Sequence, residues 1–158
     1  MKSPLALLLL LCGLALAGCG PQTTPRPPCP KGELCLEWGN NGEPDSLDPQ
    51  IAGAEWETVI LNDLFVNLTD TDQAGRTIPG MATHWEVSDD ALTWTFHLRD
   101  AKWSDGVPVT AGDFVFGLQR LMDPKTAAEQ ASQVYAIKNA KLVNGGKLPV
   151  SALGVRAI

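Results

Sequence analysis

An alternating run of apolar and polar residues over positions 92–99 is the feature that most restricts the fold of this chain. The apolar members of this run are Leu92, Trp94, Phe96 and Leu98. Because successive side chains of a strand point to opposite faces, the run predicts a strand with one buried face. We interpret Trp94, Phe96 and Leu98 as core, and Trp85 and Trp103 likewise. A shorter run at 85–87 precedes it, and the Asp-rich segment 88–91 between the two runs predicts a hairpin.

Helices are predicted on both sides of this hairpin. Apolar residues recur at helical spacing between positions 57 and 68, and this helix is expected to pack one face on a sheet. Its apolar stripe comprises Val59, Ile60, Leu64, Phe65 and Leu68. Thr110 has the position of an N-cap, and Asp113, three residues later, completes a capping box. The helix that follows should end before the Asp-Pro pair at 123–124, because the residue before a proline disfavours the helical conformation.

Three weaker patterns complete the prediction of secondary structure. A further helix is expected from about position 126 through 133. Alternating or apolar residues at 34–38 and at 154–158 indicate short strands. Two adjacent glycines at 145–146 should break the chain between these elements.

The first residues have the layout of a secretory signal. Lys2 precedes an apolar run over 5–17, which is followed by small residues. The run is about 13 residues long, whereas a membrane-spanning helix needs about 20. The sequence Leu-Ala-Gly-Cys at 16–19 resembles the lipobox of bacterial lipoproteins, which implies cleavage after Gly18 and a lipid on Cys19. The alternative is an ordinary signal peptide followed by an unrelated cysteine.

The charge balance and the cysteines narrow the range of partners and compartments. A formal net charge of -6 argues against nucleic acid as a partner and against electrostatic binding to anionic lipid. Cys29 and Cys35 lie close together in the sequence, and an oxidising compartment would allow a disulfide between them. Two unpaired thiols in a flexible lead-in are the alternative.

The residue patterns indicate neither an enzyme nor a metal centre nor a bound cofactor. Asp89 and Asp90 are adjacent carboxylates, but a hairpin turn does not form the pocket that a catalytic pair requires. His84 and His97 are interpreted as solvated histidines, and two cysteines without a nearby histidine are too few ligands for a zinc site. The sequence also lacks a nucleophile motif and a glycine-rich phosphate loop.

Several short segments carry a resemblance to a known family. They are 40–44 with 46–49, 79–90 with 94–99, 103–111 with 113–115, and the pairs at 119–120, 123–124 and 126–127. In this order they resemble the family 5 extracellular solute-binding proteins, which are the peptide- and nickel-binding subunits of ABC importers. The last three pairs resemble the oligopeptide-binding branch of that family. The resemblance covers roughly positions 34–158.

The resemblance implies an α/β fold of the periplasmic-binding-protein-like class II type, a two-lobed clamshell that closes on its solute by a hinge. It divides the chain into a signal peptide (1–18), a lipid-anchor tether (19–33), a first segment of the larger lobe (34–65) and an incomplete smaller α+β domain (66–158). An oligopeptide would lie extended between the lobes, with its backbone paired to protein strands, and would pass to the ABC permease subunits. Because family members are much longer, we expect a truncated N-terminal fragment that cannot close on solute alone.

The resemblance also implies where a peptide would contact this chain. The loop after the Ser-Leu-Asp-Pro turn corresponds to Gly53, Ala54 and Glu55. Glu55 would offer a carboxylate to the solute, or it is an exposed loop acid. A second contact position corresponds to Gln130, where the family has an aromatic residue, and nearby Tyr135 is a substitute that we do not favour.

Two alternative functions stay open at this point. The solute can be a murein peptide, a di- or tripeptide or a nickel complex instead of a longer peptide. The second alternative is a structural or interaction lipoprotein of the cell envelope. All of these place the protein on the extracytoplasmic side of a membrane, held there by the lipid on Cys19.

Replacing the expected lipid acceptor tests the prediction for the N-terminus. We expect Cys19→Ser to leave the precursor uncut by the lipoprotein signal peptidase, because the thiol that would carry the lipid is missing. Gel mobility and metabolic labelling with a radioactive fatty acid measure this. Cys12→Ser, inside the apolar run, is the matched control and should be processed and labelled normally. Normal processing of Cys19→Ser would refute the lipid anchor.

Overall fold

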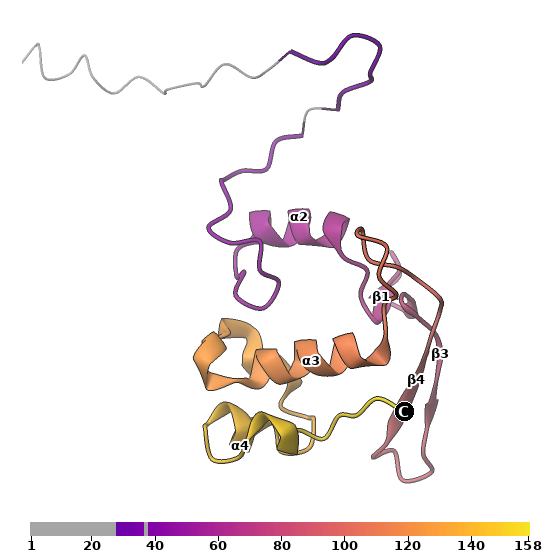
Figure 1. The fold of residues 1–158 in the computed structure, drawn as a ribbon, viewed down its shortest axis with the longest axis vertical. Helices are drawn as coiled ribbons and strands as arrows, with labels where there is room; N and C mark the ends of the chain where they lie inside the picture. Colours follow the sequence, from indigo (N-terminus) through magenta and orange to yellow (C-terminus); the bar gives the residue numbers. More distant parts are fainter. Residues whose placement is uncertain (1–27, 37) are drawn as a thin grey trace, which may run out of the picture. The chain divides into compact units, whose positions relative to one another are not determined.

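The computed structural model of the protein describes residues 28–36 and 38–158 (Figure 1). The expected signal peptide at 1–18, Cys19 and the first part of the tether lie outside the described residues. The chain divides into two units, Met1–Trp38 and Gly39–Ile158. Among the helices that the structure describes, none combines the length and the apolar character needed to cross a membrane.

The described part of the first unit contains a closed loop instead of the strand expected at 34–38. Cys29 and Cys35 are joined by a disulfide, with their Cα atoms 5.9 Å apart. Residues 34–36 and Trp38 have no regular secondary structure, and their large apolar side chains are exposed. The strand prediction was therefore wrong for these residues. An alternating pattern needs a partner strand to satisfy its backbone groups, and the described residues provide none at this position.

Helix α2 extends over Glu55–Leu64, so it ends earlier than the predicted helix at 57–68. Phe65 is extended, with φ -123° and ψ 145°, and its N–H still bonds to the carbonyl of Leu61. The buried side chains of α2 are Glu57 and Leu61, whereas Val59 from the predicted stripe is 40% exposed. One of the two buried residues of this helix is therefore the polar Glu57, whose burial apolar periodicity could not predict.

A hairpin that was not predicted follows α2. Strands β1 (Thr69–Thr71) and β2 (Thr77–Pro79) pair antiparallel, with Asp70 opposite Ile78. The connecting turn is held by Asp72, whose side chain accepts hydrogen bonds from the backbone N–H groups of Ala74 and Arg76. A short side chain that bonds to nearby backbone is a common way to build such a turn.

The predicted hairpin around segment 88–91 is confirmed. Strands β3 (Ala82–Val87) and β4 (Trp94–Leu98) pair antiparallel and lie side by side in Figure 1. Trp85 faces Phe96 across the strands, with ring centroids 6.3 Å apart. The interpretation as core was wrong for Trp94, Trp103 and Phe96, which are 55%, 42% and 36% exposed. No second layer of the described residues covers the face that carries Trp94 and Phe96, so the alternation predicts which residues share a face but not whether that face is buried.

A close backbone approach at Gly80 joins the two hairpins. The N–H groups of Met81 and Ala82 donate to the carbonyls of Asn67 and Leu68, at 2.8 and 2.9 Å. A Cβ built on Gly80 would lie 2.3 Å from the carbonyl oxygen of Asn67. Only glycine fits at this position, because any side chain would push the two backbone segments apart.

Helix α3 (Ala111–Met122) has the predicted boundaries. Thr110 is its N-cap, and the Asp113 carboxylate accepts hydrogen bonds from the Thr110 N–H at 2.7 Å and from its hydroxyl at 3.0 Å. The helix ends directly before Asp123 and Pro124, as expected. The capping box and the Asp-Pro stop are local signals, which is why the sequence placed both ends correctly.

Short elements follow α3 in place of the helix expected at 126–133. They are two 3-10 segments, η1 (Pro124–Thr126) and η2 (Glu129–Val134), then α4 (Ala140–Asn144) and a third 3-10 segment, η3 (Val150–Ala152). The expected helix is interrupted because Ala127 adopts a left-handed conformation with φ 52°. The break at 145–146 is confirmed, and the strand expected at 154–158 is absent because these residues pair with no described strand.

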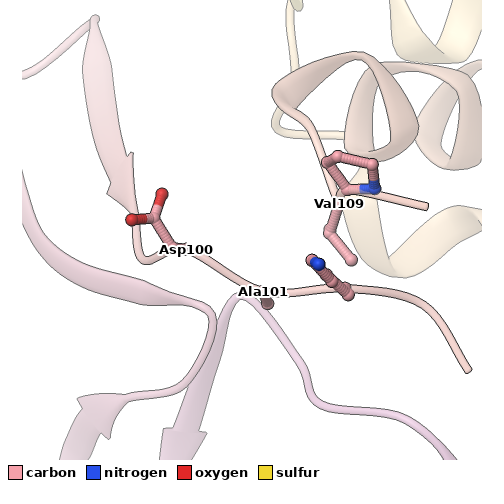
Figure 2. Close-up of a pocket in the computed structure, with 5 residues that line it drawn as sticks. Asp100, Ala101 and Val109 are labelled. Atoms are coloured by element: carbon pink, nitrogen blue, oxygen red, sulfur yellow. The ribbon is translucent and has the colours of Figure 1, made fainter. Parts of the chain in front are cut away.

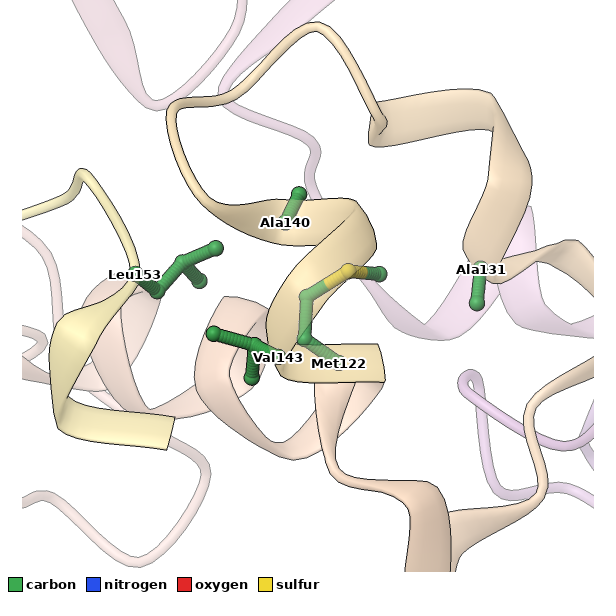
Figure 3. Packing of buried hydrophobic residues seen from close by; sticks show 5 residues of the cluster. All are labelled: Met122, Ala131, Ala140, Val143 and Leu153. Carbon is green, nitrogen blue, oxygen red and sulfur yellow. The ribbon is translucent and has the colours of Figure 1, made fainter. Parts of the chain in front are cut away.

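These short elements pack on the end of α3 to form the main hydrophobic core of the second unit. Its buried members are Met122, Ala131, Ala140, Val143 and Leu153 (Figure 3). Met122 and Val143 are fully buried, and in Figure 3 their side chains lie next to each other between α3 and α4. Small residues on α4 and η2 allow this close packing around a flexible methionine.

Truncating the central methionine tests this core. We expect Met122→Ala to lower the free energy of unfolding by about 2–5 kcal/mol, because it removes a fully buried side chain and leaves a cavity. Phe116→Ala on the same helix is the matched control, since Phe116 is 67% exposed, and it should change stability by less than about 1 kcal/mol. Chemical denaturation monitored by circular dichroism gives both values. Equal losses in the two variants would contradict the assignment of the core.

Candidate ligand-binding site

A buried carboxylate shapes the loop that precedes α2. Glu57 is 4% exposed and lies in the first turn of that helix. Its Oε1 accepts hydrogen bonds from the N–H groups of Asp45 and Ser46, at 2.9 and 3.0 Å. Its Oε2 accepts from the N–H groups of Gly53 and Ala54, at 2.8 and 3.0 Å. One side chain thus binds both ends of the loop over 45–54.

These four donors decide the ionisation of Glu57. The N–H groups of Ala54, Ser46 and Gly53, in that order, hold the pKa of the Glu57 carboxyl below its usual range, and burial only partly opposes them. A buried carboxylate is costly without such donors, whereas hydrogen bonds from several N–H groups favour its charged form. Glu57 is therefore an anion at neutral pH.

An ion pair connects the middle of the same loop to α3. Both guanidinium Nη atoms of Arg120 contact the Asp48 carboxylate, at 2.8 and 2.5 Å. Gln50 completes the link, since its Oε1 accepts from Arg120 and its Nε2 donates to the carbonyl of Gly117 at 2.7 Å. The hydrogen bond from Arg120 lowers the pKa of the Asp48 carboxyl, and the pair raises the pKa of the guanidinium. Loop 45–54 is thus fixed to α3 by a fork of two parallel bonds.

The structure brings together the two segments that were predicted to contact a peptide. Gly53 and Ala54 are fixed by Glu57, and Glu55 is the exposed first residue of α2. A Cβ built on Gly53 would lie 3.1 Å from Oε2 of Glu129, the residue next to Gln130. The segments are far apart in the sequence but meet at this point. Glu55 and Glu129 are both exposed, and a cationic or hydrogen-bond-donating ligand group would complement such carboxylates.

The remaining predicted residues take different positions. Gln130 is exposed, and its Oε1 accepts a 2.6 Å hydrogen bond from Gln133 within η2. The hydroxyl of Tyr135 donates to Asn144 at 2.6 Å, so this side chain is bonded to the end of α4. The hydroxyl of Tyr135 is thus already used in a contact within the protein.

Sequence reasoning missed the residues that hold this site. Glu57 stands three residues after an N-cap, but Ala54 occupies the cap, so the usual Ser/Thr-x-x-Glu signal is absent. Arg120 was noted only as part of the family resemblance, at 119–120. Its pairing with Asp48 spans 72 residues, and no local pattern reports such a contact.

A separate pocket lies between β4 and α3. It is lined by Asp100, Ala101, Lys102, Pro108 and Val109, next to the bridge between Lys102 and Pro108 (Figure 2). None of the predicted contact residues lines it. The pocket gathers one acidic and one basic side chain, Asp100 and Lys102, and we do not assign it to ligand binding.

Comparison with known proteins identifies the family. Residues 76–152 match the family model described as bacterial extracellular solute-binding proteins, family 5 middle. The chain is 49% identical over 123 residues to the periplasmic oligopeptide-binding protein OppA of Escherichia coli K12, covering 75% of this chain and 22% of that protein. It is 45% identical over 119 residues to the periplasmic murein peptide-binding protein MppA of the same organism, covering 73% and 22%.

Solved structures agree with these sequence matches. The structure of Haemophilus influenzae OppA in complex with the peptide RPPGFSPFR superposes with a TM-score of 0.70 and 43% identity, covering 75% of this chain and 24% of that one. The chain belongs to family 5 of the extracellular solute-binding proteins, and its relatives include the oligopeptide-binding members. It spans about a fifth of the length of the curated relatives that it matches.

Removing the charge of Glu57 tests its role in the loop. Because the folded pKa is below the unfolded value near 4.5, the stabilisation by Glu57 is complete above that pH and is lost as the pH falls through the folded pKa. We expect Glu57→Gln to lower the thermal unfolding midpoint by several degrees at pH 7. The difference from wild type should shrink steadily below pH 4.5.

Glu55→Gln is the matched control for this measurement, because it removes an exposed carboxylate from the same helical turn. Its unfolding midpoint should stay close to that of wild type at every pH. A Glu57→Gln variant with wild-type stability at pH 7, or with a difference from wild type that does not depend on pH, would contradict the assignment.

Proposed function

We propose that this chain is part of a lipid-anchored, extracytoplasmic solute-binding component of an ABC importer, and that the solute is an oligopeptide. The observation that carries the proposal is the close approach of Gly53 to Glu129, the residue next to Gln130, in a chain that is 49% identical to an oligopeptide-binding protein. The two segments that the family resemblance marks as peptide contacts therefore lie next to each other at this point. This proximity supports a peptide site at loop 53–55.

In this proposal the peptide binds through its backbone between two lobes. Residues 34–65 would begin the larger lobe and residues 66–158 would form most of the smaller domain, with the opposing lobe supplied by sequence outside this chain. Backbone pairing would accept peptides of many sequences, since every peptide presents the same donors and acceptors. The loaded protein would then deliver its peptide to the permease subunits.

The proposed roles of the loop residues follow from their contacts. Gly53 and Ala54 present backbone in a fixed conformation, because Glu57 holds both of their N–H groups. Glu55 offers an exposed carboxylate directly after them. Glu57 and the pair Asp48–Arg120 act as positioning residues, since their contacts hold this loop and they offer less exposed surface than Glu55.

Thermal unfolding with peptides tests the proposal. The protein is expressed from the reading frame that contains this chain together with any sequence that continues it. A mixed pool of short peptides should raise its unfolding midpoint, because a ligand bound only by the native state adds about 2.7 kcal/mol at a hundredfold excess over Kd. A pool of free amino acids at equal mass concentration is the control and should have little effect.

Single variants then locate the site. Glu55→Gln should reduce the peptide-induced shift, whereas Asp63→Asn, an exposed acid in the last turn of α2, should leave it unchanged. A continuing frame that encodes a second lobe, with permease and ATPase genes nearby, supports the importer. No shift with any peptide pool refutes peptide binding, and a shift with murein peptides or a nickel complex alone would assign a different solute.

A further inference from the structure

The polar face of the β3–β4 hairpin gathers three potential metal ligands. His84 and Glu86 alternate along β3, and His97 on β4 lies directly opposite His84. Each of the three side chains offers one ligand atom, and these atoms all lie within 4.8 Å of one another. We propose that His84, Glu86 and His97 bind a divalent transition-metal cation that accepts nitrogen and oxygen ligands, such as zinc.

The separation of two donors already suits such an ion. Nε2 of His97 lies 3.5 Å from Oε1 of Glu86. Two ligands of a tetrahedral zinc ion with bonds of about 2.0–2.1 Å are roughly 3.4 Å apart. This contact is too long for a good hydrogen bond, and a shared cation would fit between the two atoms.

An unsatisfied atom provides independent support. Nε2 of His97 is shielded from solvent, and it has no hydrogen-bond partner among the described residues. A shielded polar atom without a partner is costly, and a bound ion is one of the few groups that can satisfy it. The atom points toward Glu86, where the proposed ion would lie.

The hydrogen bonds of Thr83 prepare His84 for coordination. The Thr83 hydroxyl donates its only hydrogen to the carbonyl of His97, at 3.1 Å. Its oxygen therefore accepts from Nδ1–H of His84, at 2.9 Å, which leaves Nε2 of that ring with a free lone pair. An oxygen acceptor on the second ring nitrogen is typical of metal-binding histidines, because it fixes the tautomer and the ring orientation.

The two rings need a small rearrangement to bind one ion. They are stacked, with centroids 4.2 Å apart and an angle of 3° between their planes, so the lone pairs of the two rings lie in parallel planes. The His84 ring is held by Thr83, whereas rotation of the His97 ring about its Cβ–Cγ bond is a soft motion that would turn its lone pair toward the same ion. Glu86 is largely exposed and can follow the ion, and water would fill the remaining coordination position.

The amino-acid spacing did not indicate this site. His84 and His97 are the two histidines of the whole chain, and the turn of the hairpin separates them in the sequence. Strand pairing places them opposite each other, because residues in register across an antiparallel pair share a face. The proposal is independent of peptide binding, since the hairpin contains none of the predicted peptide contacts.

Titration of the chain with zinc tests the proposal. Any free thiol is alkylated beforehand, because thiolates also bind zinc. Isothermal titration calorimetry should show one ion bound per chain, and NMR signals of both histidine rings should change together. His84→Asn and Glu86→Gln should each weaken zinc binding by about tenfold or more, because each removes a ligand from a three-ligand site.

Asp89→Asn is the matched control, since it removes one negative charge from the turn of the same hairpin, and it should leave the affinity for zinc within about twofold of wild type. Both His84 and Glu86 are exposed, so their replacement should leave the hairpin folded, and circular dichroism checks this. Histidine signals that change independently, or a His84→Asn variant with wild-type affinity for zinc, would overturn the proposal.

Discussion

The carboxylate of Glu57 accepts hydrogen bonds from two separate stretches of backbone, at 45–46 and at 53–54, and the loop between them takes its shape from these bonds. A charged group inside a protein needs this number of donors to remain ionised. The loop and the carboxylate depend on each other, because the loop supplies the N–H groups that Glu57 needs and the carboxylate holds these groups in place. The proposed peptide contacts at 53–55 depend on this arrangement.

Loop 45–54 is connected through a series of contacts to the hydrophobic core of the second unit. The pair Asp48–Arg120 fixes the loop to α3, and the end of α3 places Met122 in the core. The same core holds Ala131, which lies one residue beyond Gln130. The two proposed contact segments are thus positioned by one helix, which accounts for their meeting although they are distant in the sequence.

The β3–β4 hairpin presents two chemically different faces. Trp85 and Phe96 belong to one face, and the proposed metal ligands His84, Glu86 and His97 belong to the other. Trp94 remains largely exposed within the described residues. Apolar alternation predicted the strands correctly, whereas the interpretation of Trp94 as core needed a covering layer that these residues do not provide. From the sequence, the histidines of the polar face are interpreted as solvated. Strand pairing brings them together there with Glu86.

The sequence by itself determined the features that depend on local signals: the β3–β4 hairpin, both ends of α3, the break at 145–146 and the family to which the chain belongs. Tertiary structure decided what depends on distant partners. The pattern at 34–38 formed no strand without a pairing strand, and the left-handed Ala127 divided an expected helix. The contacts of Glu57 and Arg120 and the juxtaposition of the two histidines likewise arise only after folding, because propensity and spacing describe neighbours along the chain and not neighbours in space.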